Sequence, residues 1–231
     1  MRLLFSRLQS WFSMLRSDPV GFIVYLLYLV VTVLLSLILH EIAHGYVAYR
    51  CGDPTAKMFG RLSLDPRKHL DPLGTICMFA FGIGWAKPVP VNPRYFHKPA
   101  RDMMLVALAG PLTNFLLAGL CGVLLWLTLT LLPPLQWQHS TGYIFALKTL
   151  QAGVIINFGL AWLNLLPIPP LDGSKVVAYF LPMNAALRYL SVERYGFVIL
   201  LALLFTGLLG QVLGPLVSGS AVGLLSLLGI L

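Results

Sequence analysis

Residues 20–50 read VGFIVYLLYLVVTVLLSLILHEIAHGYVAYR, and this stretch decides the fold. Its first part, residues 20–39, contains no charged side chain. About twenty apolar residues in a helix are enough to cross the hydrocarbon core of a bilayer. The stretch therefore predicts a membrane-spanning helix that carries a His-Glu-x-x-His motif, formed by His40, Glu41 and His44, close to its end.

The spacing of this motif has a chemical meaning. Residues four apart on a helix share one face, so His40 and His44 can bind a single metal ion while Glu41 reaches a water molecule beside it. Ionisable side chains inside lipid are costly and usually functional. We therefore predict a zinc ion at His40 and His44, with Glu41 as the general base of a hydrolase that uses water directly.

The composition is that of an integral membrane protein. Of the 231 residues, 58% are hydrophobic and only 10% are charged, which is far more apolar than a soluble enzyme. This length has room for about four to six membrane-spanning helices with short connections, and none for a separate soluble domain of ordinary size. We expect an all-α polytopic membrane protein.

The net charge of +8 does not indicate a nucleic-acid partner. The basic residues lie in predicted loops between apolar segments rather than along one polar face, so the predicted partner of the loops is the anionic lipid of the bilayer. The three cysteines lack C-x-x-C spacing and predict neither a disulfide framework nor a cysteine-bound metal. No feature predicts an oligomeric state.

The apolar runs define the expected order of elements. Segment 1–19 combines basic residues with apolar positions at helical spacing, so we expect an amphipathic helix in the membrane interface. Residues 20–231 are expected to form one intramembrane domain. Within it we predict spanning helices at about 20–49, 102–132, 150–166 and 195–213, a mixed and mainly helical interfacial segment at 174–194, and a short final helix at 216–231.

The connection between the first two helices contains an apolar stretch of a different kind. Residues 73–86 read LGTICMFAFGIGWA, which is too short and too rich in glycine to span as a helix. We predict a membrane-associated β-hairpin or re-entrant loop that turns near residues 82–84, with other parts of the protein covering its backbone.

A third metal ligand is expected from a distant part of the sequence. A catalytic zinc usually has three protein ligands, and Asp172 stands directly after the third predicted helix, which Pro167, Pro169 and Pro170 must end. Its carboxylate is a suitable oxygen ligand. An Asp-Gly turn after prolines is a common alternative reading of the same residues.

The basic residues also predict the orientation of the chain. Twelve Lys and Arg lie in 50–101 and 174–194, which share one side if three helices cross, whereas four lie in the N-terminus and 133–149. The positive-inside rule makes the first side cytoplasmic. The first and third helices then bring His40, His44 and Asp172 to a similar depth near the cytoplasmic face.

Several other polar residues have less decisive patterns. Asn114 and Asn164 stand in apolar helices, where an interhelical hydrogen bond and a substrate-binding role compete. The remaining histidines lack a partner at ligand spacing and are expected at the surface; they are His69, His97 and His139.

Two other function classes explain part of these features. A non-proteolytic zinc transporter or sensor would also bury histidines in the membrane. A transport path needs further ionisable groups across the bilayer, however, and the outer halves of the predicted helices contain none. A membrane scaffold with degenerate motifs would bind no stoichiometric zinc.

Three ordered motifs carry a family resemblance: HEIAH at 40–44, AGPLTN at 109–114 and NLLPIPPLDG at 164–173. Together they resemble the site-2 protease family of intramembrane zinc metalloproteases, peptidase family M50. The stretches GDPTAKMFGRLSLDPRKHLDPLGT and GWAKPVPVNP are similar to its short prokaryotic branch, which lacks PDZ and CBS domains. The resemblance implies a prokaryotic cell-membrane enzyme that holds zinc with His40, His44 and Asp172 and uses Glu41 as catalytic base.

The resemblance also implies how a substrate is held. Asn164 would hydrogen-bond the substrate backbone, and Asn114, from the family's Gly-Pro-x-x-Asn pattern, is a second candidate for substrate binding. The apolar loop before Trp85 would be a β-hairpin that offers an edge to an unwound substrate. The expected reaction is hydrolysis of peptide bonds within or near the transmembrane segment of a membrane protein. The substrate segment must unwind for this reaction, and pairing with the hairpin edge would replace the helical hydrogen bonds that it loses.

Overall fold

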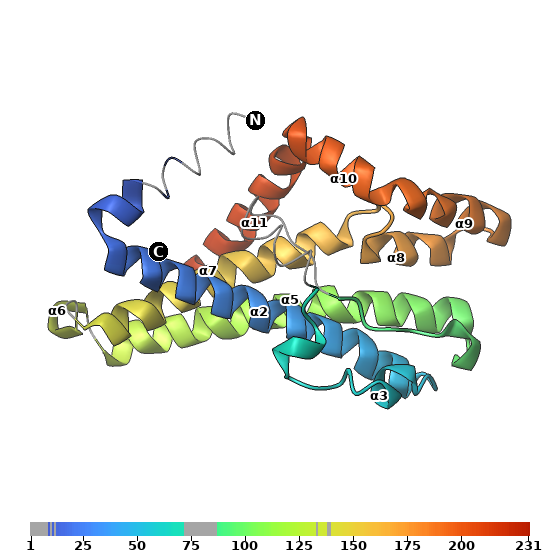
Figure 1. The fold of residues 1–231 in the computed structure, drawn as a ribbon, viewed down its shortest axis with the longest axis horizontal. Helices are drawn as coiled ribbons and strands as arrows, with labels where there is room; N and C mark the ends of the chain where they lie inside the picture. The colour runs from blue at the N-terminus through green and yellow to red at the C-terminus, as the bar shows by residue number, and fades with distance from the viewer. Residues whose placement is uncertain (1–8, 10, 12, 72–86, 133, 138–139) are drawn as a thin grey trace.

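A computed structural model describes residues 9, 11, 13–71, 87–132, 134–137 and 140–231. In these residues the regular structure is helical, and no strand occurs among them (Figure 1). Among the described residues, four helices have the length and the apolar composition needed to cross a membrane. The prediction of an all-α chain is confirmed for this part of the chain, and its four candidate spans lie within the predicted range of four to six.

The first of these helices, α2 (Pro19–Arg50), agrees with the predicted span at 20–49. Asp18 caps its start, because its Oδ1 atom accepts a hydrogen bond from Gly21 N at 2.9 Å, and Pro19 occupies the first turn. At 1.5 Å per residue α2 is about 48 Å long, which exceeds the thickness of the hydrocarbon core. It therefore tilts or extends beyond the membrane.

Helices α5 (Pro99–Leu131) and α7 (Thr141–Leu165) pack against α2 and against each other, and Figure 1 shows α2 crossing the other two at an angle. Small residues permit this close packing: a side chain at Gly153 would lie only 2.5 Å from Cys121 Sγ. The predicted start of the third helix at about residue 150 was wrong. The helix begins nine residues earlier, at Thr141, and Ser140 caps it, because its Oγ atom accepts a hydrogen bond from Tyr143 N.

The fourth spanning helix is α11 (Leu208–Leu227), not the predicted 195–213. The apolar run is divided at Gly207, whose φ of +78° is a left-handed conformation that ends α10 (Gly196–Phe205) after ten residues. The predicted short helix at 216–231 is the second part of α11. This helix packs on α5 and α7, where Ala221 joins Ala118, Val154 and Phe158 in one buried cluster.

The segment between α7 and α10 is helical, as predicted for 174–194. It consists of α8 (Asp172–Phe180), α9 (Met183–Leu190) and the 3-10 helix η3 (Ser191–Tyr195). In Figure 1, α8 and α9 lie at the same end of the bundle as the short helix α3 (Thr55–Met58) and the start of α5. The remaining short helices are η1 (Pro66–Lys68), η2 (Pro93–Tyr95) and α6 (Pro134–Trp137).

Two predicted features lie outside the described residues. The β-hairpin or re-entrant loop was expected at 73–86, and the structure describes the chain only up to residue 71 and again from 87. The amphipathic segment 1–19 is described in part, and residues 13–17 of it are helical. Both remain predictions.

Candidate metal centre

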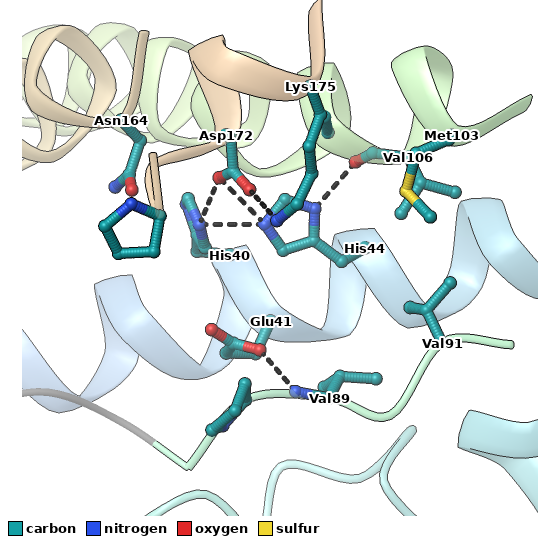
Figure 2. Close-up of a pocket in the computed structure, with 13 residues that line it drawn as sticks. His40, Glu41, His44, Val89, Val91, Met103, Val106, Asn164, Asp172 and Lys175 are labelled. Carbon is teal, nitrogen blue, oxygen red and sulfur yellow. Dashed lines mark hydrogen bonds and ion pairs between the residues drawn. The ribbon is translucent and has the colours of Figure 1, made fainter. Parts of the chain in front are cut away.

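Three side chains from two helices converge on one point beneath the surface of the bundle. His40 and His44 lie one turn apart on α2, and Asp172 is the first residue of α8. The two imidazole Nε2 atoms are 2.9 Å apart, and Asp172 Oδ2 lies 3.4 Å from that of His40 and 3.2 Å from that of His44 (Figure 2). The three residues are no more than 9% exposed.

These separations match the requirements of zinc. Bonds of 2.0–2.1 Å in a tetrahedral arrangement place neighbouring ligand atoms about 3.3 Å apart. The three described donor atoms lie within 4.8 Å of one another and have the two-imidazole, one-carboxylate chemistry of a catalytic zinc site. The predicted ligand set of His40, His44 and Asp172 is therefore one that could hold the ion.

Hydrogen bonds on the far side of each imidazole leave the Nε2 atoms free for the metal. His44 Nδ1 donates to the carbonyl oxygen of Val106 at 2.6 Å, and His40 Nδ1 lies 2.6 Å from Asn114 Oδ1. Such partners fix the tautomer and the ring orientation of metal-binding histidines. Both partners lie on α5, so this helix orients the two candidate ligands that α2 supplies.

Helix α5 can approach the ligands this closely because Gly110 has no side chain. A Cβ atom there would lie 2.4 Å from His40 Cε1 and 2.5 Å from His44 Nε2. Any residue other than glycine would displace the imidazoles. The backbone at Gly110 therefore forms one wall of the metal centre.

The proline break after α7 places Asp172. Leu165 is the last residue of α7, and the chain then turns through 166–171 before α8 begins. Lys175 Nζ lies 3.7 Å from Asp172 Oδ1, the oxygen that does not face the histidines. Burial raises the pKa of Asp172, but the hydrogen bonds with His40 and His44 outweigh it and hold this pKa below its usual range, so the carboxylate is ionised.

Glu41 lies in the same cavity and points toward a different segment of the chain. Its Oε2 atom accepts a hydrogen bond from Val89 N at 2.8 Å, as Figure 2 shows. The cavity has a volume of about 380 Å³, and apolar residues from 88–91 and from the start of α5 line it together with the metal-binding group. Its size suits a segment of substrate rather than a metal ion alone.

Buried polar residues hold the segment that contains Val89. Arg61 Nη2 donates to the carbonyl oxygens of Lys87 and Pro88, and Asp53, which is 0% exposed, accepts a hydrogen bond from Asn92 N at 2.6 Å. The backbone of this segment therefore has a fixed position relative to Glu41.

Of the two asparagines predicted for the site, Asn164 lines the cavity, whereas Asn114 is buried between the helices. Asn164 lines the cavity, and its Nδ2 atom donates to Leu160 O at 2.9 Å. Asn114 is 0% exposed and is not among the described residues that line the cavity; it contacts His40 instead. The prediction of a surface position was wrong for His69, which is 1% exposed and bonds to Ser63 O at 2.7 Å.

Comparison with known proteins identifies the family of this chain. The model of Peptidase family M50 matches residues 28–133 and 138–207, which is most of the chain. This chain belongs to peptidase family M50. The family assignment agrees with the resemblance and with the ligand set described above.

The M50 assignment is supported by individual relatives. The protein named "Putative zinc metalloprotease YwhC" from Bacillus subtilis is 41% identical over 200 residues, which cover 87% of this chain and 90% of the relative. The protein named "Putative zinc metalloprotease Rip2" from Mycolicibacterium smegmatis is 31% identical over 210 residues, 87% of this chain and 76% of the relative. No solved structure matches the chain significantly. The chain is thus an M50 zinc metalloprotease, and its described residues include four helices that could cross a membrane.

Two residues of the M50 site were not predicted from the sequence. Lys175, one turn after Asp172 on α8, lines the cavity. Asn157 on α7 is 2% exposed and bonds to Asn114. The signal that could have found Asn157 is the one that singled out Asn114 and Asn164, an amide in the middle of an apolar helix.

Proposed function

We propose that this chain is an intramembrane zinc endopeptidase that hydrolyses peptide bonds within or near the transmembrane segments of other membrane proteins. The observation that carries the proposal is the position of the metal centre. His40, Glu41 and His44 lie on a helix that is long and apolar enough to span a membrane, and they open into a cavity large enough for substrate. A metalloprotease of soluble substrates has no need for such a location.

The depth of the site supports a substrate that is itself in the membrane. His40 lies about 15 Å along α2 from Arg50, which marks the basic end of the helix. By the positive-inside rule this end is cytoplasmic. The active site of the proposed enzyme is therefore submerged close to the cytoplasmic face of a multi-pass protein in the cell membrane.

His40, His44 and Asp172 would hold the zinc ion. When bound, zinc supplies Lewis acidity, which lowers the pKa of water to about 7 and polarises the carbonyl of the scissile bond. The Glu41 carboxylate accepts the proton of the attacking water and later donates it to the leaving amine. The hydrogen bond from Val89 N keeps this carboxylate turned into the cavity.

Asn164 and the cavity walls would bind the substrate. Asn164 lines the cavity, where its amide is positioned to bond the backbone of an extended segment. A substrate in helical form hides its carbonyl groups in its own hydrogen bonds, so it has to unwind before cleavage. Asn114 acts in this proposal through His40 rather than on the substrate.

The test is cleavage of a model single-span membrane protein by the purified chain in lipid vesicles. Glu41→Gln keeps the size of the side chain and an acceptor for Val89 N, but it removes the base, so cleavage should fall by about 10² to 10⁴. Zinc should remain at one ion per chain. The matched control is Glu193→Gln, which changes the other, exposed glutamate of the chain and should leave cleavage unchanged.

Cleavage by Glu41→Gln at the wild-type rate would refute this mechanism. If the wild-type chain binds zinc but cleaves no membrane substrate, the alternative of a non-proteolytic zinc transporter or sensor is favoured.

A further inference from the structure

A continuous row of buried hydrogen bonds connects helix α7 to the metal centre. Asn157 Nδ2 donates to the carbonyl oxygen of Gly153 at 2.8 Å, and Asn114 Nδ2 donates to Asn157 Oδ1 at 2.9 Å. The row ends where Asn114 Oδ1 meets His40 Nδ1 at 2.6 Å. Asn114 and Asn157 are 0% and 2% exposed, so water does not compete for these bonds.

We infer that Asn157 is a positioning residue of the metal centre: through Asn114 it determines which ring nitrogen of His40 is available to the metal. Asn157 does not itself touch the ligand atoms. The inference rests on the role of His40 as a zinc ligand in the proposed function and adds Asn157, a residue of α7, to the groups that orient this ligand.

The direction of the row follows from its fixed end. A backbone carbonyl can only accept, so Asn157 must turn its Nδ2 atom toward Gly153 and its Oδ1 atom toward Asn114. Asn114 must then donate with Nδ2, which leaves its Oδ1 atom facing His40 Nδ1. That nitrogen has to carry the ring proton, and the lone pair remains on Nε2, the atom that faces Asp172 and His44.

His44 shows why His40 needs this arrangement. The partner of His44 Nδ1 is the carbonyl oxygen of Val106, which enforces the correct tautomer directly. The partner of His40 is an amide, and an amide can turn by 180° to exchange its oxygen and nitrogen. A turned Asn114 would donate to His40 Nδ1, move the ring proton to Nε2 and block the metal.

Asn157 supplies the acceptor that prevents this turn. The other oxygen near Asn114 Nδ2 is Ser36 O at 3.5 Å, a distance at which a hydrogen bond is weak. Without Asn157, the Asn114 amide would lose the strong hydrogen bond that holds its Nδ2 atom toward α7. The amide could then turn by 180° with little to oppose it. The buried amide would also lose a partner inside the helix bundle.

The test compares two substitutions of Asn157 by their affinity for zinc, measured with a competing chelator on the purified full chain in detergent. Asn157→Leu fills similar volume but offers no acceptor, and zinc should bind 10- to 100-fold more weakly, the usual cost of losing an outer partner of a metal ligand. Asn157→Asp retains an oxygen that accepts from Asn114 Nδ2, and as a buried neutral acid it also has an O–H group that can donate to Gly153 O. The affinity should therefore stay close to that of the wild-type chain.

A role in packing alone predicts the opposite order, because leucine suits an apolar helix and a buried carboxyl does not. Equal affinities for Asn157→Leu and the wild-type chain, or a larger loss with Asn157→Asp, would overturn the inference. The control is Val154→Ala, one turn away in the buried cluster, which should lower the unfolding temperature without weakening zinc binding.

A second measurement needs no substitution and covers the case that Asn157→Leu does not fold. Nitrogen NMR of the zinc-free wild-type chain should show a proton on His40 Nδ1, and a bare Nδ1 would overturn the inference. A wild-type chain that binds no zinc would instead contradict the proposed function, so the two failures are distinguishable.

Discussion

Gly110 shows how a single residue determines the geometry of the metal centre. Its backbone passes so close to both imidazoles that a Cβ atom would lie within 2.6 Å of His40 Nε2 as well as of His44 Nε2. Contacts this short do not occur in folded proteins, so the rings or the helix would have to move. The ligand positions therefore depend on the missing side chain.

Gly110→Ala should weaken zinc binding by about tenfold or more, because it displaces the imidazoles from the positions that their α5 partners hold. Zinc affinity of the purified chain, measured with a competing chelator, checks this. Gly119→Ala is the matched control on the same helix, since among the described residues no atom apart from the adjacent backbone of α5 lies within 4 Å of a Cβ atom at Gly119. The control should bind zinc normally; equal affinities for the two variants would contradict the geometry.

At this scale the sequence predicted the three side chains that the structure brings together, but not the residues that hydrogen-bond to them. His40 and His44 follow from motif spacing, as does Glu41 as the proposed base, and Asp172 follows from its place after a proline break. Asn157 was missed because an amide in an apolar helix can bond to any neighbouring helix, and only the packed structure shows which one. The same ambiguity left two roles open for Asn114.

Among the elements, segment 87–92 connects the polar loop after α2 to the active site. Asp53 fixes the end of this segment by hydrogen bonds. Its Oδ2 atom accepts a hydrogen bond from Asn92 N at 2.6 Å, and its Oδ1 atom accepts one from Thr55 N at 2.9 Å. Since Val89 N donates to Glu41 Oε2, a shift of this segment would move the side chain that we propose as the catalytic base.

Asp53→Asn should lower the stability of the chain by about 1–3 kcal/mol and slow cleavage while zinc remains bound. The amide turns an NH₂ group toward a backbone N–H that previously had an acceptor, and it leaves a buried donor unpaired. Thermal unfolding checks the loss of stability, the zinc content checks that the ion remains bound, and the cleavage rate checks the loss of activity. Asp65→Asn, which changes a more exposed side chain of the same loop, should leave all three unchanged; a similar loss there would contradict this account.

The ends of the helices were predicted correctly where the sequence changes sharply from apolar to polar residues, and they were misplaced where the sequence stays apolar. The first helix has Asp18 and Pro19 at one end and Arg50 at the other, so its bounds agree with the structure. The fourth span lies within a long apolar run whose only local stop is Gly207. Many glycines occur in that run, and the sequence does not show that Gly207, whose φ is left-handed, interrupts the helix while others such as Gly210 and Gly214 lie within α11.

At the scale of the whole molecule, a buried polar site is surrounded by helices whose outer surfaces are apolar. Large apolar side chains such as Leu35 and Leu116 are exposed on the spanning helices, as expected where lipid replaces water. The candidate metal-binding group, by contrast, is buried between α2, α5 and α8 and lines the cavity described above. This arrangement could be inferred from hydropathy and motifs, whereas the closeness of α5 to the ligands required the structure.

The position of the cut bond in a substrate tests the central claim most directly. A single-span model substrate is incubated with the zinc-loaded chain in lipid vesicles, and the masses of the fragments are measured. The proposed function predicts a cut within the apolar segment or at its membrane edge, and no fragments from Glu41→Gln. Cuts confined to the water-exposed flanks, or fragments of equal yield from Glu41→Gln, would contradict an intramembrane zinc endopeptidase.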